Sequence, residues 1–297
     1  MSVTVRVPAK VNVQLAVGAA RADGFHDLAN VFLAVGLYDE VTVTPADGLR
    51  VTCDGPDAAL VPLDRTNLAA RAAIALAERY GRTPDVHLHI AKDIPVAGGM
   101  AGGSADGAGA LLACDALWGT GASRDELLEI CAELGSDVPF SLVGGAALGT
   151  GRGEKLTALE TGGAFHWVFA MADRGLSTPA VFREFDRLTA DRDVPEPVAC
   201  EALLDALAAG DADALAATVS NDLQPAALSL FPELSGTLAA GRTAGALATL
   251  VSGSGPTTAF LVRDAGSARE VAGALRASGT CRAVRTAAGP VPGATLV

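Results

Sequence analysis

The sequence predicts an α+β protein with two domains, and three observations support this fold class. At 297 residues the chain is longer than most single domains and long enough to form two hydrophobic cores. Segments with the two-residue periodicity of strands recur along the chain together with segments of helical periodicity. Half of the residues are hydrophobic and only 4% are aromatic, which is typical of a globular protein. We expect domains over residues 1–155 and 156–297, with the boundary near residues 150–165.

The first half of the chain contains most of the predicted strands. Apolar residues alternate over residues 3–7 and 11–17, which predicts two strands joined by Pro8, Ala9 and Lys10. Because alternate side chains of a strand project to the same side, Lys10 and Asn12 share a face, which is either part of a site or open to solvent. Further strands are predicted at residues 31–35, 41–44 and 49–53, and over the segment VHLHI.

Helix signals follow in the same half. The segment TNLAARAAIALAERYG predicts a helix with Thr66 or Asn67 as its N-cap and Gly81 as its stop. Residues 104–118 are rich in small side chains and predict a helix that packs closely against a sheet. Ser123 and Glu126 form a capping box for the next predicted helix, RDELLEICAELG, which ends at Gly135.

A glycine-rich loop, KDIPVAGGMAGGSAD, precedes the alanine-rich helix. Glycines let backbone N–H groups approach an anion, and the N-terminus of the following helix adds partial positive charge, so the loop suits phosphate. It matches neither the GxxxxGK[ST] phosphate loop nor the GxGxxG dinucleotide pattern. An ordinary glycine turn between strand and helix is the alternative.

Two further residues are candidates on local grounds. Asp137 lies two residues after the stop at Gly135 and two before Pro139, so constrained backbone holds its carboxylate. His26 lies beside Phe25 in the turn ADGFHDL. An ordinary turn aspartate and a structural histidine are the alternative interpretations.

The second half of the chain alternates helices with fewer strands. A strand at residues 166–171 precedes the segment RGLSTPAVF, and the segment SGSG at residues 252–255 forms a second glycine turn. The other elements predicted there are helices at 200–208, 211–219, 233–241 and 267–277 and strands at 258–262 and 281–285.

Charge and cysteine content limit the partners. The net charge of −12 argues against binding to nucleic acid or to an anionic membrane surface, which needs clustered Lys and Arg. The five cysteines are scattered without a CxxC pair, which favours free thiols in a reducing cytosol. The uncharged window at 243–262 is broken by SGSGPTT, so no membrane span is predicted, and no export signal is apparent. We expect a cytoplasmic protein, and the sequence leaves a monomer and a homodimer open.

Taken in order, PAKVNVQL, PVAGGMAGGSAD, LGSDVPF and GSGPTTAF resemble the three motifs of the GHMP kinase superfamily of small-molecule kinases. RADGFHDL and LSTPAVF further resemble the branch that acts on the cytidine diphosphate ester of methylerythritol. The resemblance covers about residues 5–262 and is weakest over 190–240. It implies an N-terminal domain like ribosomal protein S5 domain 2 and a ferredoxin-like C-terminal domain.

The resemblance also implies a reaction and its cofactors. The protein would transfer the γ-phosphoryl group of ATP, with Mg²⁺, to the 2-hydroxyl of cytidine diphosphate methylerythritol, in the non-mevalonate route to isoprenoids. Asp137 would accept the hydroxyl proton, and Lys10 would hold the hydroxyl or Asp137 in place. No protein ligand of a metal is assigned.

The resemblance also implies binding residues, which are the residues of this chain that match the binding positions of the same motifs. The ATP-binding residues implied are Pro95, Val96, Ala97, Gly98, Gly99, Met100, Ala101, Gly102, Gly103, Ser104 and Ala105, with Asn67 and Lys92 near the adenine. The substrate-binding residues implied are Asn12, Phe25, His26, Thr178, Pro179 and Phe182, with Phe25 and Phe182 flanking the cytosine.

The sequence departs from the family pattern at a few positions. Phe25 replaces a tyrosine, Ala105 replaces a serine, and Ala97 and Ala101 replace glycines, which stiffens the loop. The alternatives are another kinase of the superfamily, of the homoserine or mevalonate type, and a noncatalytic ligand-binding member. The aromatic cluster argues against the first, and the presence of Lys10 with Asp137 argues against the second.

Overall fold

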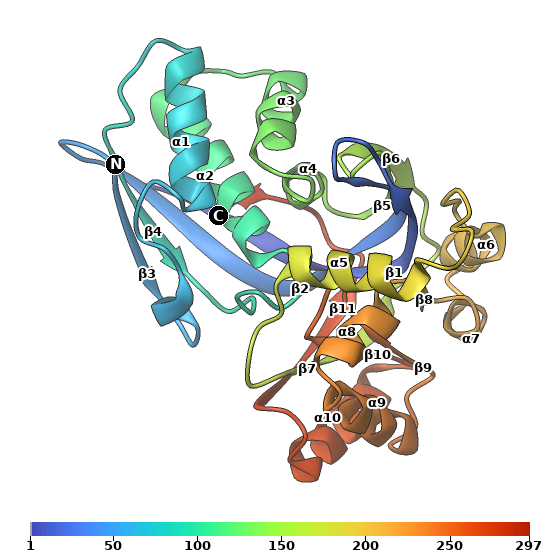
Figure 1. Ribbon diagram of the computed structural model, residues 1–297. Helices are drawn as coiled ribbons and strands as arrows, with labels where there is room; N and C mark the ends of the chain where they lie inside the picture. The colour runs from blue at the N-terminus through green and yellow to red at the C-terminus, as the bar shows by residue number, and fades with distance from the viewer. Residues whose placement is uncertain (1) are drawn as a thin grey trace.

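The computed structural model describes residues 2–297 and contains two β-sheets flanked by helices (Figure 1). The first sheet runs β12-β1-β2-β4-β3; β5 pairs with β2 and β6, and β8 pairs with β1. Its strands are β1 (Val3–Ala20), β2 (His26–Pro45), β3 (Arg50–Asp54), β4 (Val86–Ala91), β5 (Ala146–Thr150), β6 (Lys155–Leu159), β8 (Ser220–Asn221) and β12 (Thr295–Leu296).

The two long strands β1 and β2 correct the sequence prediction. The two strands expected on either side of Pro8 form the single strand β1, and those expected at 31–35 and 41–44 belong to the single strand β2. The pairing register shifts between Pro8 and Ala9, so a local irregularity accommodates a proline that cannot donate a ladder hydrogen bond. Sequence periodicity breaks at such a point although the strand continues.

Helices of the first half cover the first sheet on one side, as Figure 1 shows for α1 and α2 above β2. They are η1 (Ala58–Leu60), α1 (Leu68–Arg79), α2 (Gly102–Trp118), α3 (Arg124–Leu134) and α4 (Val138–Val143). The N-cap of α1 is confirmed as Asn67, whose Oδ1 accepts from the Ala69 N–H at 2.8 Å. The capping box of Ser123 and Glu126 is also confirmed. The short helix α4, which begins after Asp137, was not predicted.

The second sheet has the antiparallel order β11-β7-β10-β9. Its strands are β7 (Phe165–Met171), β9 (Ala248–Val251), β10 (Thr258–Val262) and β11 (Ala283–Gly289). The helices of this half are α5 (Thr178–Thr189), α6 (Glu201–Ala209), α7 (Ala212–Ala216), α8 (Gln224–Leu230), α9 (Leu234–Thr243) and α10 (Ala265–Ser278). Helix α5 was not predicted: the segment RGLSTPAVF was assigned no element, whereas a proline such as Pro179 is favoured in the first turn of a helix.

Alternate residues of β7 face two different packed layers. Phe165, Trp167 and Phe169 belong to the main core, which also contains the buried residues of β1, β2, α1 and α2. Val168 and Ala170 belong to a second core with α10. The two-residue repeat of the strand thus lets β7 join the main core to the C-terminal helices.

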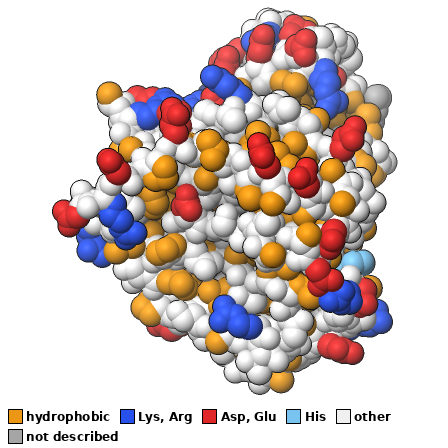
Figure 2. All heavy atoms as spheres, turned by 90° about the vertical axis from the view of Figure 1, so that its right-hand side faces the viewer, with side chains coloured by type: hydrophobic (Ala, Val, Ile, Leu, Met, Phe, Trp, Pro, Cys, Tyr) orange, Lys and Arg blue, Asp and Glu red, His pale blue; other side chains and the backbone are white. Residues whose placement is uncertain are grey.

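The C-terminal end of the chain returns to the first sheet. In β12, Leu296 pairs with Val5 of β1, and the Val297 N–H donates to the Thr4 carbonyl at 3.1 Å. Within residues 2–297, no helix has both the length and the apolar composition that crossing a membrane requires. On the described surface seen in Figure 2, acidic and basic side chains are interspersed and form no continuous basic patch.

Candidate active site

A cavity of about 610 Å³ brings together most of the residues that the sequence singles out. Its walls come from β1, the start of β2, the glycine loop, the first turn of α2, the start of α4 and α5. The predicted site residues that line it are Lys10, Asn12, Phe25, His26, Pro95, Ala97, Gly98, Gly99, Ala101, Gly102, Gly103, Ser104, Asp137, Thr178, Pro179 and Phe182.

Lys10 is buried at the centre of one wall. Its Nζ donates to Asn12 Oδ1 at 2.6 Å and to the Gly99 carbonyl at 3.0 Å, and it lies 3.8 Å from Asp137 Oδ2. Burial lowers the pKa of Lys10, and the neighbouring Asp137 opposes that shift. The expected placement of Lys10 and Asn12 on one face is confirmed by their hydrogen bond. Lys10 therefore links the glycine loop to the carboxylate across the cavity.

Asp137 is the N-cap residue of α4, but its side chain makes no capping hydrogen bond. The backbone carbonyl of Asp137 accepts from the Ser141 N–H at 3.1 Å, which fixes the residue at the helix start. The side chain is one-third exposed, toward the cavity that it lines. Its carboxylate is thus held in position and free to accept a proton or a hydrogen bond from a ligand.

The glycine loop adopts a strained backbone at two of its alanines, Ala97 and Ala101. Ala97 has φ 51° and Ala101 has φ 59°, in the left-handed region that glycine adopts more easily. Gly99 has φ 75°, and a Cβ there would lie 2.0 Å from the Ser252 carbonyl oxygen. The loop therefore tolerates alanine at two turns but requires glycine where it meets the second glycine turn.

That second glycine turn holds the loop from the other half of the chain. Ser252 Oγ donates to the Gly99 carbonyl at 3.0 Å, and the Thr257 N–H donates to the Gly98 carbonyl at 3.2 Å. Gly253 and Ser254 of the same turn line the cavity. The loop is thus fixed between β1 and the SGSG turn before any ligand binds.

The N-terminus of α2 opens into the cavity without a side-chain cap. Ala101 is the N-cap residue and offers no side-chain acceptor to the first N–H groups of a 17-residue helix. Gly102, Gly103 and Ser104, which form the first turn, all line the cavity. Unpaired N–H groups and the helix dipole together make this turn an anion site.

The far end of the cavity is aromatic. The ring centroids of His26 and Phe182 are 4.9 Å apart, and Phe25 is half exposed. The guanidinium of Arg152 lies 5.1 Å from the centre of the Phe25 ring. Such an end suits a planar ring that can stack between aromatic side chains.

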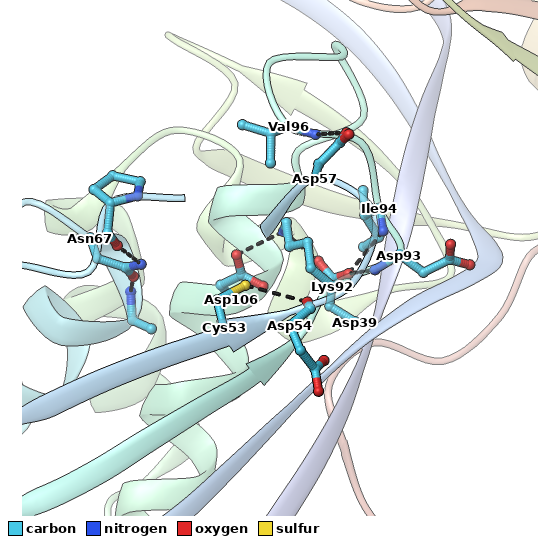
Figure 3. Close-up of polar contacts among 12 residues, drawn as sticks. Asp39, Cys53, Asp54, Asp57, Asn67, Lys92, Asp93, Ile94, Val96 and Asp106 are labelled. Carbon is cyan, nitrogen blue, oxygen red and sulfur yellow. Dashed lines mark hydrogen bonds and ion pairs between the residues drawn. The ribbon is translucent and has the colours of Figure 1, made fainter. Parts of the chain in front are cut away.

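Five predicted ATP-binding residues do not line the cavity: Asn67, Lys92, Val96, Met100 and Ala105. Asn67 uses its side chain to cap α1, and its Nδ2 donates to the Pro62 carbonyl at 2.7 Å. Lys92 is buried, and Figure 3 shows it pointing between Asp39 and Asp106. Its Nζ lies 2.5 Å from Asp39 Oδ2 and 2.7 Å from Asp106 Oδ2.

Lys92, Asp39 and Asp106 thus form a buried cluster of one ammonium group and two carboxyl groups. Asp39 Oδ1 also accepts from the N–H groups of Asp93 and Ile94, whereas Asp106 Oδ1 has no hydrogen-bond partner among residues 2–297. Burial raises the pKa of Asp106 well above its usual value, against the attraction of Lys92. Burial lowers the pKa of Lys92, but the two carboxyl groups outweigh it and raise that pKa overall. Asp39 is therefore the better-stabilised anion of the pair.

Sequence reasoning missed several residues of the cavity wall. Asn30 accepts from Asn12 Nδ2 at 2.7 Å, Asp186 contacts His26 Nε2 at 2.8 Å, and Ser254 Oγ lies 2.9 Å from Thr178 Oγ1. Arg152 and Arg183 also line the cavity. The SGSG pattern could have pointed to Ser254, but the other residues follow no local pattern and reach the site only through the fold.

Family models match both halves of the chain. Residues 67–145 match the N-terminal domain of the GHMP kinases and residues 203–281 match their C-terminal domain. A relative from Streptomyces coelicolor is 84% identical over the full length of both chains, and one from Thermobifida fusca is 62% identical and covers all of this chain and 98% of its own. Both are named 4-diphosphocytidyl-2-C-methyl-D-erythritol kinase.

Solved structures agree in fold. A crystal structure of 4-(cytidine 5'-diphospho)-2C-methyl-D-erythritol kinase is 34% identical, covers 96% of this chain and 98% of its own, and superposes with a TM-score of 0.77. A homoserine kinase from Cytophaga hutchinsonii has the same TM-score at 19% identity and covers 100% of this chain and 97% of its own, which is a likeness of fold alone. The predicted α+β kinase fold is confirmed.

Proposed function

The chain belongs to the GHMP kinase family, and we propose that it phosphorylates the 2-hydroxyl of 4-diphosphocytidyl-2-C-methyl-D-erythritol with ATP. The products are the 2-phosphate and ADP, in the non-mevalonate route to isoprenoid precursors. The observation that carries this proposal is a single cavity with an uncapped helix N-terminus, a Lys10–Asp137 pair and an aromatic end. We place the reaction in the cytoplasm, in line with five free thiols.

ATP is the phosphoryl donor. The backbone N–H groups of the loop and of the first turn of α2 bind its phosphates, and the Ser104 hydroxyl donates to them. Asn67 and Lys92 stay predictions as contacts of the adenine, and so do the contacts of Val96, Met100 and Ala105 with ATP.

Lys10 and Asp137 act on the acceptor hydroxyl. Asp137 accepts the hydroxyl proton as the oxygen attacks the γ-phosphorus, and the bond from that phosphorus to the β-phosphate oxygen breaks. Lys10, 3.8 Å from Asp137, orients the carboxylate and the hydroxyl as a fixed cation. The hydrogen bond from Lys10 to the Gly99 carbonyl holds the Lys10–Asp137 pair next to the loop that binds the triphosphate.

Mg²⁺ fits the donors present, although residues 2–297 contain no group of three or more His, Cys, Asp or Glu side chains that could hold a metal ion. Protein sites for this ion often supply only one or two carboxylates and leave the rest to phosphates and water. Ser104, in the phosphate-binding turn, is the cavity residue that would hold it. When bound, it neutralises charge on the phosphates.

The cytidine end of the substrate binds at the aromatic end of the cavity. Phe25 and Phe182 stack on the cytosine, and His26 contacts its polar edge. Thr178 and Pro179, at the start of α5, and Asn12 contact the rest of the substrate. A homodimer stays a prediction that light scattering would test.

The test of this function is ADP release measured separately with the cytidylyl alcohol, with homoserine and with mevalonate. We expect turnover with the cytidylyl alcohol alone. Turnover confined to homoserine or mevalonate would replace this proposal with another kinase of the family. Binding of the cytidylyl alcohol without ADP release would indicate a noncatalytic member.

A further inference from the structure

The aromatic end of the cavity contains one ring with polar edges, His26, and the structure fixes one of its two nitrogens. His26 is 6% exposed, and its Nε2 lies 2.8 Å from Asp186 Oδ1 on α5. A carboxylate oxygen accepts hydrogen bonds and does not donate them, so Nε2 carries the hydrogen of this contact. In the neutral ring the other nitrogen, Nδ1, is then an acceptor.

That second nitrogen is left for a ligand. Among residues 2–297, no group makes a hydrogen bond to His26 Nδ1, and the ring lines the cavity beside Phe182. The Phe182 and Phe185 rings pack against the imidazole at centroid distances of 4.9 and 6.0 Å, which restricts rotation of its ring. The ring therefore presents a fixed acceptor to whatever base occupies the aromatic end.

Cytosine and uracil differ at the group that such an acceptor reads. Position 4 of cytosine carries an amino group, which donates, whereas position 4 of uracil carries an oxygen, which accepts. An acceptor nitrogen binds the amino group and repels the oxygen. A donor at the same place would reverse that preference.

We propose that Asp186 is a positioning residue that sets the His26 tautomer and thereby makes the site select cytidine over uridine diphosphate esters. This inference rests on the proposed function, because it takes the aromatic end to be the base-binding end. Asp186 acts through His26, so its effect falls on base choice and not on the transfer of the phosphoryl group. One matched base contact corresponds to about 10- to 100-fold in affinity.

The variant Asp186→Ala tests the inference because it removes the acceptor that holds the hydrogen on Nε2. Asparagine would not serve, since its amide oxygen can accept from Nε2 as the carboxylate does. Without the acceptor the hydrogen is free to move to Nδ1, and the ring then offers a donor where it had offered an acceptor. Asp186 is on the surface, with a side chain 42% exposed, so the substitution leaves the core intact. Asp191→Ala, at an exposed position just beyond the same helix, is the matched control.

The measurement is the Kd of CDP and of UDP by titration calorimetry at pH 8. We expect the unmodified protein and Asp191→Ala to bind CDP at least 10-fold more tightly than UDP. In Asp186→Ala the ratio of the two Kd values should fall toward one, while the Kd of ATP stays within twofold. With the cytidylyl alcohol as substrate, KM should rise much more than kcat falls.

Each other outcome overturns the inference in a distinct way. An unchanged CDP to UDP ratio in Asp186→Ala, or an equal loss of both nucleotides, would show that Asp186 does not set base choice. Equal binding of CDP and UDP by the unmodified protein would reject selection by His26 and leave the kinase function standing. Binding of neither nucleotide would reject the proposed function together with the inference.

Discussion

Replacing Lys92 with methionine should destabilise the fold strongly, although the sequence resemblance assigns this lysine to ATP. The substitution keeps the length of the side chain but removes the cation that lies 2.5 and 2.7 Å from two buried carboxyl groups (Figure 3). Removing one partner of a buried ion pair typically costs roughly 3–5 kcal/mol, because the other charge stays buried without compensation. We expect Lys92→Met to lose an amount in this range.

The assay is urea unfolding followed by circular dichroism at pH 7, with the slope of the transition checked for a constant value. Lys155→Met is the control, because Lys155 is an exposed lysine, and its effect should stay within about 0.5 kcal/mol. A loss of less than about 1 kcal/mol in Lys92→Met would contradict the structural role and refute this reasoning. A raised KM for ATP at unchanged stability would instead support the predicted contact with the adenine.

The cluster of Lys92, Asp39 and Asp106 also predicts how the free energy of unfolding changes with pH. The pKa of Asp106 in the folded protein is raised by burial above its value in the unfolded chain. Its contribution to stability is therefore fully present below the unfolded pKa, near 3.9, and is lost as pH rises through the higher folded pKa. Asp106→Asn, which imitates the neutral carboxyl, should remove that loss and should be tolerated far better than Lys92→Met. If the free energy of unfolding by urea depends on pH in Asp106→Asn as it does in the unmodified protein, Asp106 is not the group responsible.

Three more substitutions test the roles proposed in the cavity. Asp137→Asn should lower kcat by about 100-fold or more with little change in the KM of ATP, and an unchanged kcat would remove Asp137 as the base. Phe182→Ala should raise the KM of the cytidylyl substrate by about 10- to 100-fold through lost stacking, and an equal rise for ATP would contradict that role. Gly99→Ala should weaken ATP binding at least about 10-fold, because its Cβ would lie 2.0 Å from the Ser252 carbonyl oxygen. Ala101→Gly, at φ 59°, should bind ATP normally, and equal effects of these two loop substitutions on titration of ATP would contradict the loop geometry.

The sequence alone predicted the features that depend on local chemistry. Asn67 as N-cap and the capping box at Ser123 follow from hydrogen bonds between residues a few positions apart. The glycine loop and Asp137 were found because turns and helix stops restrict which residues fit. The placement of Lys10 beside Asn12 follows from the two-residue repeat of a strand.

The features that were missed depend on residues far apart in the chain. Lys92 meets Asp39 across 53 positions and His26 meets Asp186 across 160, so no periodicity reports either contact. The unbroken strand β1 was missed because the pairing partner β2, not the sequence of β1, carries it past Pro8. Helix α5 was missed because Pro179 favours a loop and a helix start alike.

The Gly99 carbonyl accepts from Lys10 on one side and from Ser252 on the other, so one backbone oxygen joins both halves of the chain to the nucleotide loop. Ser254 of the same turn contacts Thr178 at the substrate end. A substrate that changes the equilibrium of this turn therefore changes the affinity for ATP. Because free energies of binding are reciprocal, ATP must change the affinity for that substrate by the same factor. Any coupling of the two substrates that passes through this turn would be carried by one peptide group.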